Sequence, residues 1–305
     1  MSMLEKRTVA QGRTEMIKKR PVLLLLLVLI MTLHGCKLSE LADRFSGDDY
    51  DSEYDYREMY LSNDTKDLTD KNLDAFNEAS TIYRLYIENC GDDYEKVLAA
   101  HDYIVRNCRY NKEAIDNDTL TEDDFSPYGV FVKGVAVCEG YAKAFKMLMD
   151  IAGIDCIMVT GTVNDGVAHA WNMVKLENDW YHVDVTFDDP EPETKEIVYL
   201  YLNVPDSVIE KDHTWNKNMT PEAHSDKYDY VVMNDCELDT IVQVKEIIVD
   251  SSFRKESYVS FVWTGDDMIT DQVWTNILSN TDIANLSYSC MGAAGRRMYM
   301  INLSY

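Results

Sequence analysis

The stretch GVAVCEGYAKAFKMLMDIAGI, residues 134–154, predicts a helix that begins at a cysteine and ends at a glycine. After Cys138, apolar residues recur at spacings of three and four, which is the period of a helix with one buried face. Gly153 stands where helices commonly end. At the helix N-terminus, the dipole and the free backbone N–H groups would stabilise a thiolate and also an oxyanion. Cys138 is therefore either a nucleophile or a small buried apolar residue.

The segment VAHAWNMVKLENDWYHVDVTFDD has the alternating pattern of two strands around a polar turn. If LEND forms the turn, Lys175 pairs with Trp180, and the aliphatic residues of both strands share one face. On the other face, His169 becomes a diagonal neighbour of Asp184, with about 7–8 Å between the backbones. A slip of one residue would separate the two side chains and mix them with the core residues. The pattern therefore predicts contact between His169 and Asp184.

Cysteine, histidine and aspartate are the residue types of a thiol catalytic triad. The thiol needs an imidazole to take and return a proton, and the imidazole needs an acceptor that holds its tautomer. Each residue also has an ordinary alternative: packing for Cys138, a satisfied core histidine for His169, and a strand-end cap for Asp184. His182 is a competing base, but it lies two residues before Asp184 on the same strand and would point beside it. We expect His182 to be structural.

Four segments together resemble the bacterial branch of the transglutaminase-like superfamily: GVAVCEGYAKAF, HAWN, WYHVDVTFDDP and YLYLNVPDSVIEKDHTW. The resemblance covers approximately residues 93–215. It implies an α+β papain-like thiol fold, in which a nucleophile helix packs on an antiparallel sheet. It also implies that Cys138 is the nucleophile, His169 the general base and acid, and Asp184 the orienting partner of the histidine.

Two further positions bear on the resemblance. Members of the superfamily differ in the side chain that completes the oxyanion hole, and here Tyr128, just upstream, is the candidate beside the Cys138 backbone N–H. Phe187 stands where many relatives carry Trp, and this departure leaves the triad untouched.

The resemblance leaves the reaction open, because the superfamily includes cross-linking enzymes, peptidases, amidases and inactive members. We expect hydrolysis of an amide or peptide bond in a peptide or protein substrate, since the sequence identifies no amine site that excludes water. Transamidation is the alternative among enzymes, and a surface binding module with an unused triad is the alternative outside them. No cofactor or metal is expected, since Asp188 and Asp189 are explained by a turn before Pro190.

The charge balance limits the partners. The 305 residues are 46% hydrophobic, enough for a domain of ordinary size plus a smaller one. Lys and Arg number 29 against 54 Asp and Glu, a net charge of -25. Such a field repels phosphate backbones, which argues against nucleic-acid binding and favours cations, amines or basic peptides.

The N-terminus predicts export. Lys18, Lys19 and Arg20 precede the apolar run VLLLLLVLIMTL, which is shorter than the about 20 residues of a membrane span and reads as the core of a signal peptide. The run ends in LHGC, which resembles the lipobox of bacterial lipoproteins, although His34 replaces the usual small residue. This resemblance implies that Cys36 is lipidated and anchors the protein on the extracytoplasmic face of the cell membrane. Ordinary cleavage and release is the alternative.

The domain plan follows from these signals. We expect a signal peptide over residues 1–35, a lipidated acidic tether over 36–70, a catalytic domain over 71–225 and a small α+β accessory domain over 226–305. The accessory domain carries no catalytic constellation, so packing is its expected role, with substrate selection or partner binding as alternatives.

Cysteine spacing argues against a disulfide in the catalytic domain. The patterns at residues 72–88 and 94–108 predict an antiparallel helical pair joined at CGDD, where Asp92 or Asp93 caps the second helix. A helix of about fifteen residues would separate Cys90 from Cys108 by roughly 20 Å, beyond the reach of a disulfide. Only Cys236 and Cys290 remain as an open pairing.

Overall fold

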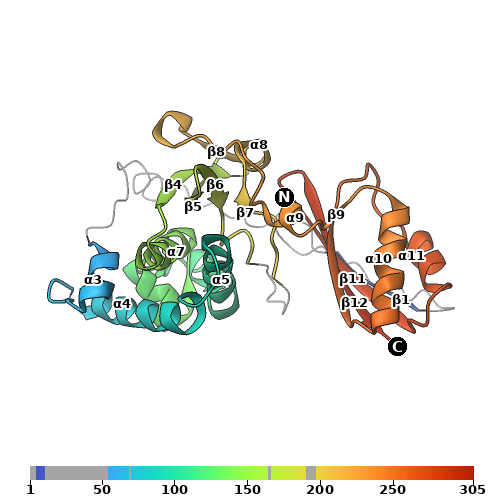
Figure 1. Cartoon of the computed structure of the whole chain (residues 1–305), viewed down its shortest axis with the longest axis horizontal. Helices are drawn as coiled ribbons and strands as arrows, with labels where there is room; N and C mark the ends of the chain where they lie inside the picture. Colours follow the sequence, from blue (N-terminus) through green and yellow to red (C-terminus); the bar gives the residue numbers. More distant parts are fainter. Residues whose placement is uncertain (1–4, 11–53, 69, 164–165, 190–196) are drawn as a thin grey trace. The chain divides into compact units, whose positions relative to one another are not determined.

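Figure 1 shows the computed structural model of the chain, in which residues 5–10, 54–68, 70–163, 166–189 and 197–305 are described. The chain divides into two compact units. The larger unit is Val28–Tyr230, and the smaller combines Met1–Leu27 with Val231–Tyr305. The units divide between residues 230 and 231, and the expected domain boundary at 225 stays a prediction.

Helix α7 (Cys138–Ala152) is the central element of the larger unit. It follows the N-cap Val137 and ends at Gly153, whose φ of 75° is the left-handed conformation of a glycine C-cap. These are the ends that the sequence predicts. The pattern predicted one buried face, whereas α7 is buried on nearly all sides, because helices pack on it as well as the sheet. Even Lys146 is buried, with its ammonium 2.9 Å from Asp150 one turn later.

Three helical segments surround α7 (Figure 1): α3 (Tyr56–Ser62), α4 (Asp70–Ile82), which continues as the π-helix η1 (Tyr83–Ile87), and α5 (Asp93–Asn107). The N-cap of α5 is Asp92, whose carboxylate accepts a hydrogen bond from the Glu95 N–H at 2.8 Å. Because α5 packs back on η1, the predicted helical pair is confirmed.

The folded unit begins earlier than the expected boundary at residue 71. Helix α3 lies inside the segment that we expected to be a tether, and Tyr56 and Leu68 are buried in the main core. Their apolar side chains pack with Phe76 and other core residues, which is why this part of the segment folds. The remainder of the expected tether, up to residue 53, lies outside the described residues.

A five-stranded antiparallel sheet covers another side of α7. Its strands, in the order β7-β6-β5-β4-β8, are β4 (Cys156–Val163), β5 (Val167–Leu176), β6 (Asp179–Val183), β7 (Leu202–Val204) and β8 (His213–Trp215). Lys175 pairs with Trp180 and Val174 with Tyr181, so the predicted register of the hairpin is confirmed. The fold is therefore the expected α+β arrangement of a helix packed on an antiparallel sheet.

Short elements complete the larger unit: β2 (Arg109–Tyr110), α6 (Lys112–Asp116), η2 (Glu122–Phe125), η3 (Gly129–Lys133), β3 (Val135–Ala136), α8 (Asp206–Ile209) and η4 (Lys217–Met219). The parallel pair of β2 and β3 leads the chain directly into α7.

The smaller unit is a separate α+β layer. After α9 (Tyr230–Met233), it contains β9 (Glu237–Leu238), α10 (Ile241–Arg254), β10 (Tyr258–Trp263), α11 (Asp271–Leu278), β11 (Asn285–Ala293) and β12 (Arg296–Ser304). The sheet order is β1-β11-β12-β10-β9. Strand β1 (Glu5–Ala10) falls within the segment predicted as a signal peptide and pairs antiparallel with β11. The apolar run at 22–33 and Cys36 lie outside the described residues.

None of the six cysteines of the described residues forms a disulfide. Cys90 and Cys108 are therefore not bonded to each other, as predicted, and no disulfide joins Cys236 to Cys290. Among the residues that the structure describes, none of the helices combines the length and the apolarity needed to cross a membrane.

Candidate active site

Cys138 is the first residue of α7 and is buried. The backbone on either side holds it in place, since the Val137 N–H donates to the Asp124 carbonyl at 2.9 Å. Gly140 allows this approach, because a Cβ there would lie 2.6 Å from the Asp124 carbonyl oxygen and 2.8 Å from the Ala136 side chain. The N-terminus of α7 is thus clamped against the η2 segment, which sets the position of the thiol.

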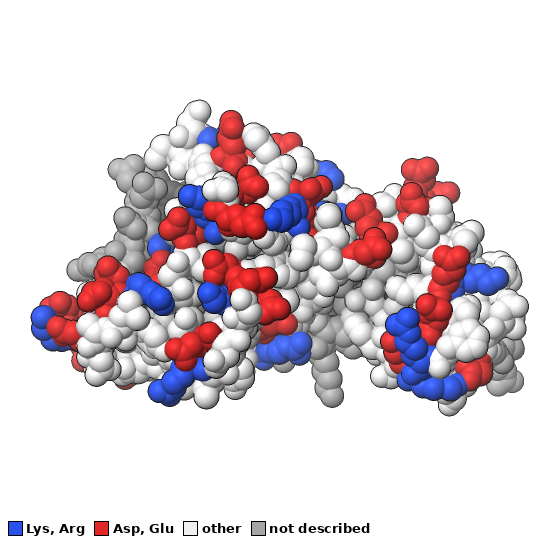
Figure 2. All heavy atoms as spheres, in the orientation of Figure 1, with Lys and Arg blue, Asp and Glu red and all other residues white. Residues whose placement is uncertain are grey.

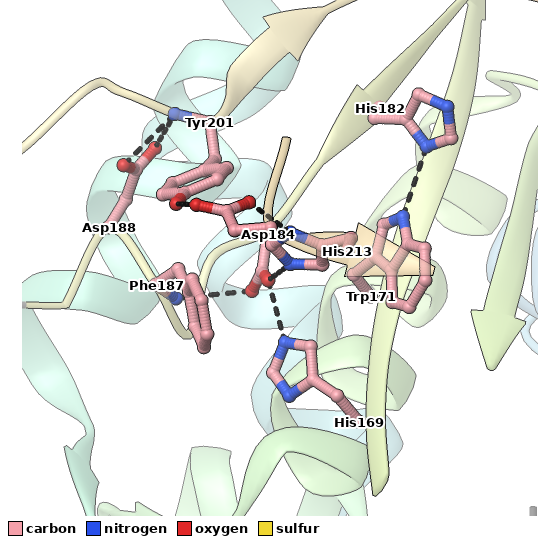
Figure 3. Close-up of polar contacts among 9 residues, drawn as sticks. His169, Trp171, His182, Asp184, Phe187, Asp188, Tyr201 and His213 are labelled. Carbon is pink, nitrogen blue, oxygen red and sulfur yellow. Dashed lines mark hydrogen bonds and ion pairs between the residues drawn. The ribbon is translucent and has the colours of Figure 1, made fainter. Parts of the chain in front are cut away.

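His169 and Asp184 form the contact that the strand pattern predicts. His169 lies on β5, the middle strand of the sheet, and Asp184 follows the last residue of β6. Their Nε2 and Oδ2 atoms are 2.6 Å apart, and the two residues are 3% and 1% exposed. Figure 3 shows the two side chains directed toward each other. The contact is therefore a buried, charge-assisted hydrogen bond.

The Cys138 thiol lies beside His169 and contributes to the raised pKa of the imidazole. Because Nε2 of His169 is engaged by Asp184, Nδ1 is the nitrogen left for the thiol. Burial lowers the pKa of His169, but the charge and hydrogen bond of Asp184 and the hydrogen bond of Cys138 together raise it to about 10. The structure thus brings all three predicted triad residues together, in the order thiol, imidazole, carboxylate.

Asp184 is held from several directions. Its backbone N–H donates to the Tyr201 carbonyl at 3.1 Å, and its Oδ1 accepts from the Phe187 N–H at 3.1 Å. The strand ends at Val183, before the end of the alternating segment, because these bonds turn the chain at Asp184. The carboxylate is therefore both a turn cap and the partner of His169. Although burial favours its neutral form, the charge and hydrogen bonds of the neighbouring histidines keep the pKa of Asp184 below its ordinary value.

A second buried acid–imidazole pair supports this turn. His101 on α5 contacts Asp188 at 3.2 Å, and Asp188 accepts backbone hydrogen bonds from Leu200 at 2.8 Å and Tyr201 at 3.1 Å. Burial lowers the pKa of His101, but hydrogen bonds and charges of its acidic neighbours raise it to about 9. The turn that we had assigned to Asp188 before Pro190 is thus tied to a helix distant in the sequence.

His182 plays the structural role that we expected. Its Nδ1 accepts from the Trp171 indole N–H at 3.0 Å, and its Nε2 lies 2.8 Å from Asp206. Trp171 in turn stacks beside His169, with ring centroids 6.0 Å apart, and Phe187 lies 4.8 Å from the same imidazole. The rings of Trp171 and Phe187 screen the His169–Asp184 contact from water, and His182 holds the Trp171 ring through its hydrogen bond.

Tyr128, the predicted oxyanion side chain, lies just before η3 and is partly buried. Lys71 and Lys133 place their ammonium groups 5.4 and 6.0 Å from the centre of its ring. Its role in an oxyanion hole stays a prediction.

His213 is the site residue that sequence reasoning missed. It lies on β8, is buried, and places Nε2 3.0 Å from the Asp184 Oδ2 that also contacts His169 (Figure 3). In the sequence, His213 belongs to the DHTW motif, which entered only as part of the family resemblance. Because His213 and Trp215 are two residues apart, an extended strand would place their side chains on one face, and this spacing was the available signal.

His169, Asp184 and His213 also form a group whose ligand atoms lie within 4.8 Å of one another, as at a metal site. The spacing favours hydrogen bonds instead. Ligands of a tetrahedral ion at about 2.0–2.1 Å would lie roughly 3.3 Å apart, whereas the two Nε2–Oδ2 distances are 2.6 and 3.0 Å.

Comparison with known proteins agrees with this geometry. Residues 81–185 match the model of the "Transglutaminase-like superfamily", a range that includes Cys138, His169 and Asp184. This part of the chain is therefore similar to the transglutaminase-like superfamily. It is 27% identical over 150 residues to the kyphoscoliosis peptidases of Mus musculus and Homo sapiens, in matches covering 43% of this chain and 22% of each relative. The chain thus spans about a fifth of the length of the curated relatives that it matches. A solved structure described as a TGase is 16% identical, with a TM-score of 0.34, over 45% of this chain and 38% of that one.

Proposed function

We propose that the transglutaminase-like domain is a thiol-dependent acyl-transfer enzyme that hydrolyses amide or peptide bonds in a peptide or protein substrate. The observation that carries the proposal is the double contact of His169, with Asp184 on one ring nitrogen and the Cys138 thiol on the other. An imidazole held in this way exchanges one proton with the thiol while its tautomer stays set by the carboxylate.

The reaction would follow in two halves. The Cys138 sulfur attacks the carbonyl carbon, and the carbonyl electron pair moves to oxygen at the N-terminus of α7, where backbone N–H groups and, we propose, Tyr128 stabilise it. His169 then gives its proton to the amide nitrogen as the C–N bond breaks, which leaves a thioester and a free amine. In the second half His169 deprotonates water, which attacks the thioester and releases the acid and the Cys138 thiolate.

Selective labelling of Cys138 tests whether the thiol is activated. Burial raises the pKa of Cys108 to about 12 and raises that of Cys156 as well, so these thiols stay protonated. We expect iodoacetamide at pH 6 to modify Cys138 first, as located by mass spectrometry. His169→Ala should abolish this selectivity, while Cys156→Ala, a matched removal of a buried thiol outside the site, should preserve it. Equal labelling of Cys138 in the wild type and in His169→Ala would contradict the proposed enzyme and favour a binding module with an unused triad.

The reaction itself is tested by the fate of the substrate. We expect the purified protein to release hydrolysed fragments from cell-wall peptides or unfolded proteins, and Cys138→Ala to release none. Cross-linked products in the presence of an amine would instead identify a transamidase.

The charge of the protein bears on the choice of substrate. The sequence contains more acidic than basic residues, and Figure 2 shows one face on which basic side chains lie among acidic ones. A field of this sign favours substrates that carry positive charge.

We propose that the enzyme acts on the extracytoplasmic face of the cell membrane, anchored by lipid on Cys36. The apolar run and the LHGC ending support this proposal. In a bacterial host, Cys36→Ala should accumulate as unlipidated precursor, detected as a loss of metabolic lipid labelling. Release of normal mature protein from this variant would show that Cys36 is no anchor.

A further inference from the structure

His213 reaches the triad from the far edge of the sheet. Asp184 follows β6, whereas His213 lies on β8, which pairs with β4 at the opposite edge. Gly161 of β4 pairs with His169 on one side and with Trp215 on the other. Side chains of paired residues share a face, so His169, Trp215 and, two residues before it, His213 all project on the same side.

Gly161 makes room for this arrangement. A Cβ at Gly161 would come within 2.9 Å of the Trp171 ring and 2.2 Å of the Thr214 carbonyl oxygen. The missing side chain lets Trp171 lie against β8, with its ring 5.0 Å from that of His213. The aromatic layer on this face thus holds the His213 ring over the sheet and in reach of Asp184.

Carboxylates flank both ring nitrogens of His213. Nε2 lies 3.0 Å from Asp184 Oδ2, and Nδ1 lies 2.7 Å from Asp212 Oδ1. The pKa of Asp184 is lowered, and an ionised carboxylate only accepts hydrogen bonds, so the contact with Asp184 is one in which Nε2–H of His213 donates. The Tyr201 hydroxyl donates to Asp212 Oδ2 at 2.6 Å, so the carboxylate that contacts His213 Nδ1 is itself held in place. Asp184 Oδ2 consequently accepts from two imidazoles at once, while Oδ1 accepts from the Phe187 N–H.

We propose that His213 is a positioning residue for the triad: its Nε2–H holds the Asp184 carboxylate in the orientation that keeps His169 Nε2 toward Asp184 and Nδ1 toward Cys138. The proposal rests on the proposed function for its catalytic meaning. Without the second donor, Oδ2 of Asp184 keeps only His169 as a partner in a buried site, and the Phe187 N–H on Oδ1 is the remaining contact that opposes rotation of the carboxylate.

Two substitutions at the same position separate this role from simple packing. His213→Gln carries an amide N–H₂ at a reach similar to that of Nε2, so it can still donate to Asp184. His213→Asn carries its amide at the reach of Nδ1, so it keeps the Asp212 contact and loses the Asp184 contact. His182→Asn is the control, because His182 is equally buried and does not contact Asp184, and the Asn amide oxygen at the reach of Nδ1 can still accept from the Trp171 N–H.

The first readout is the downfield proton NMR signal of His169 Nε2–H in the hydrogen bond to Asp184. We expect it to persist in His213→Gln and in the His182 control, and to move or exchange away in His213→Asn. The second readout is the rate of Cys138 alkylation at pH 6, which should fall about 10- to 100-fold in His213→Asn, the range for a lost hydrogen bond to a charged group.

An unchanged His169 signal in His213→Asn would overturn the proposal, as would equal effects of the Gln and Asn variants. If His213→Asn does not fold, Asp212→Asn, which weakens the anchor behind the ring, should shift the same signal, and no shift would also overturn it. Slow alkylation of Cys138 in the wild type at pH 6 would instead count against the proposed function, and the NMR signal would still decide the role of His213.

Discussion

Replacing Asp184 with Asn tests the centre of the site with a change of one charge and almost no volume. The amide oxygen can still accept from the Phe187 N–H, so the turn after β6 is retained. What is lost is the negative charge 2.6 Å from His169 Nε2. An amide N–H₂ turned toward His169 would also face a donor and favour the wrong tautomer.

The magnitude follows from the pKa of His169. A rise from 6.5 to about 10 in the folded protein corresponds to about 5 kcal/mol of preference for the imidazolium form. Burial, which opposes this rise, remains when the charge of Asp184 is removed. We therefore expect the pKa of His169 to fall below 6.5 in Asp184→Asn. Catalysis should fall by roughly 10⁴-fold, as when the aspartate of a Ser-His-Asp triad is changed to asparagine.

The measurement is an NMR titration of the His169 ring between pH 5 and 11, together with the rate of Cys138 alkylation. Asp206→Asn is the matched control, because Asp206 faces His182 at 2.8 Å in another acid–imidazole pair, which does not contact His169. It should leave the titration of His169 unchanged. If His169 titrates alike in wild type and Asp184→Asn, the carboxylate does not control the imidazole and the reasoning for the triad fails.

Three further changes probe the fold around the site. Gly161→Ala places a Cβ 2.2 Å from a carbonyl oxygen of β8, so we expect a loss of about 1–3 kcal/mol in urea unfolding; Gly292→Ala, with no neighbour closer than 3.8 Å, should change little. Asp92→Ala removes the N-cap of α5 and should cost about 1 kcal/mol in the same assay, while Asp92→Ser should restore most of it. The unfolding free energy should also decline from pH 6.5 to 9. The raised pKa values of His101 and His169 add stability that is complete below 6.5 and lost through about 9 and about 10, and burial raises the pKa of Asp188 to about 6, which acts in the same direction at lower pH. His101→Gln should make the decline smaller, and a decline of unchanged size would show that the His101–Asp188 pair does not contribute to it.

Local sequence patterns determined helix α7, which carries Cys138, and the hairpin that brings His169 to Asp184. The ends of α7 follow from short-range preferences, because a helix repeats every 3.6 residues and Gly153 takes its positive φ without strain. The contact of His169 with Asp184 was also predictable, because a tight turn sets the register of a hairpin and alternation sets its faces. Both depend only on residues close together in the chain.

Tertiary packing decided the rest of the site. Cys138 meets His169 only because α7 packs against β5. From the sequence, this contact could be predicted only through the family resemblance. His213 comes from β8, which does not pair with the hairpin that carries His169 and Asp184, so neither turn geometry nor alternation within that hairpin could place it there. Contacts between distant segments depend on which faces the whole core buries together, and that is a property of the folded chain rather than of any one segment.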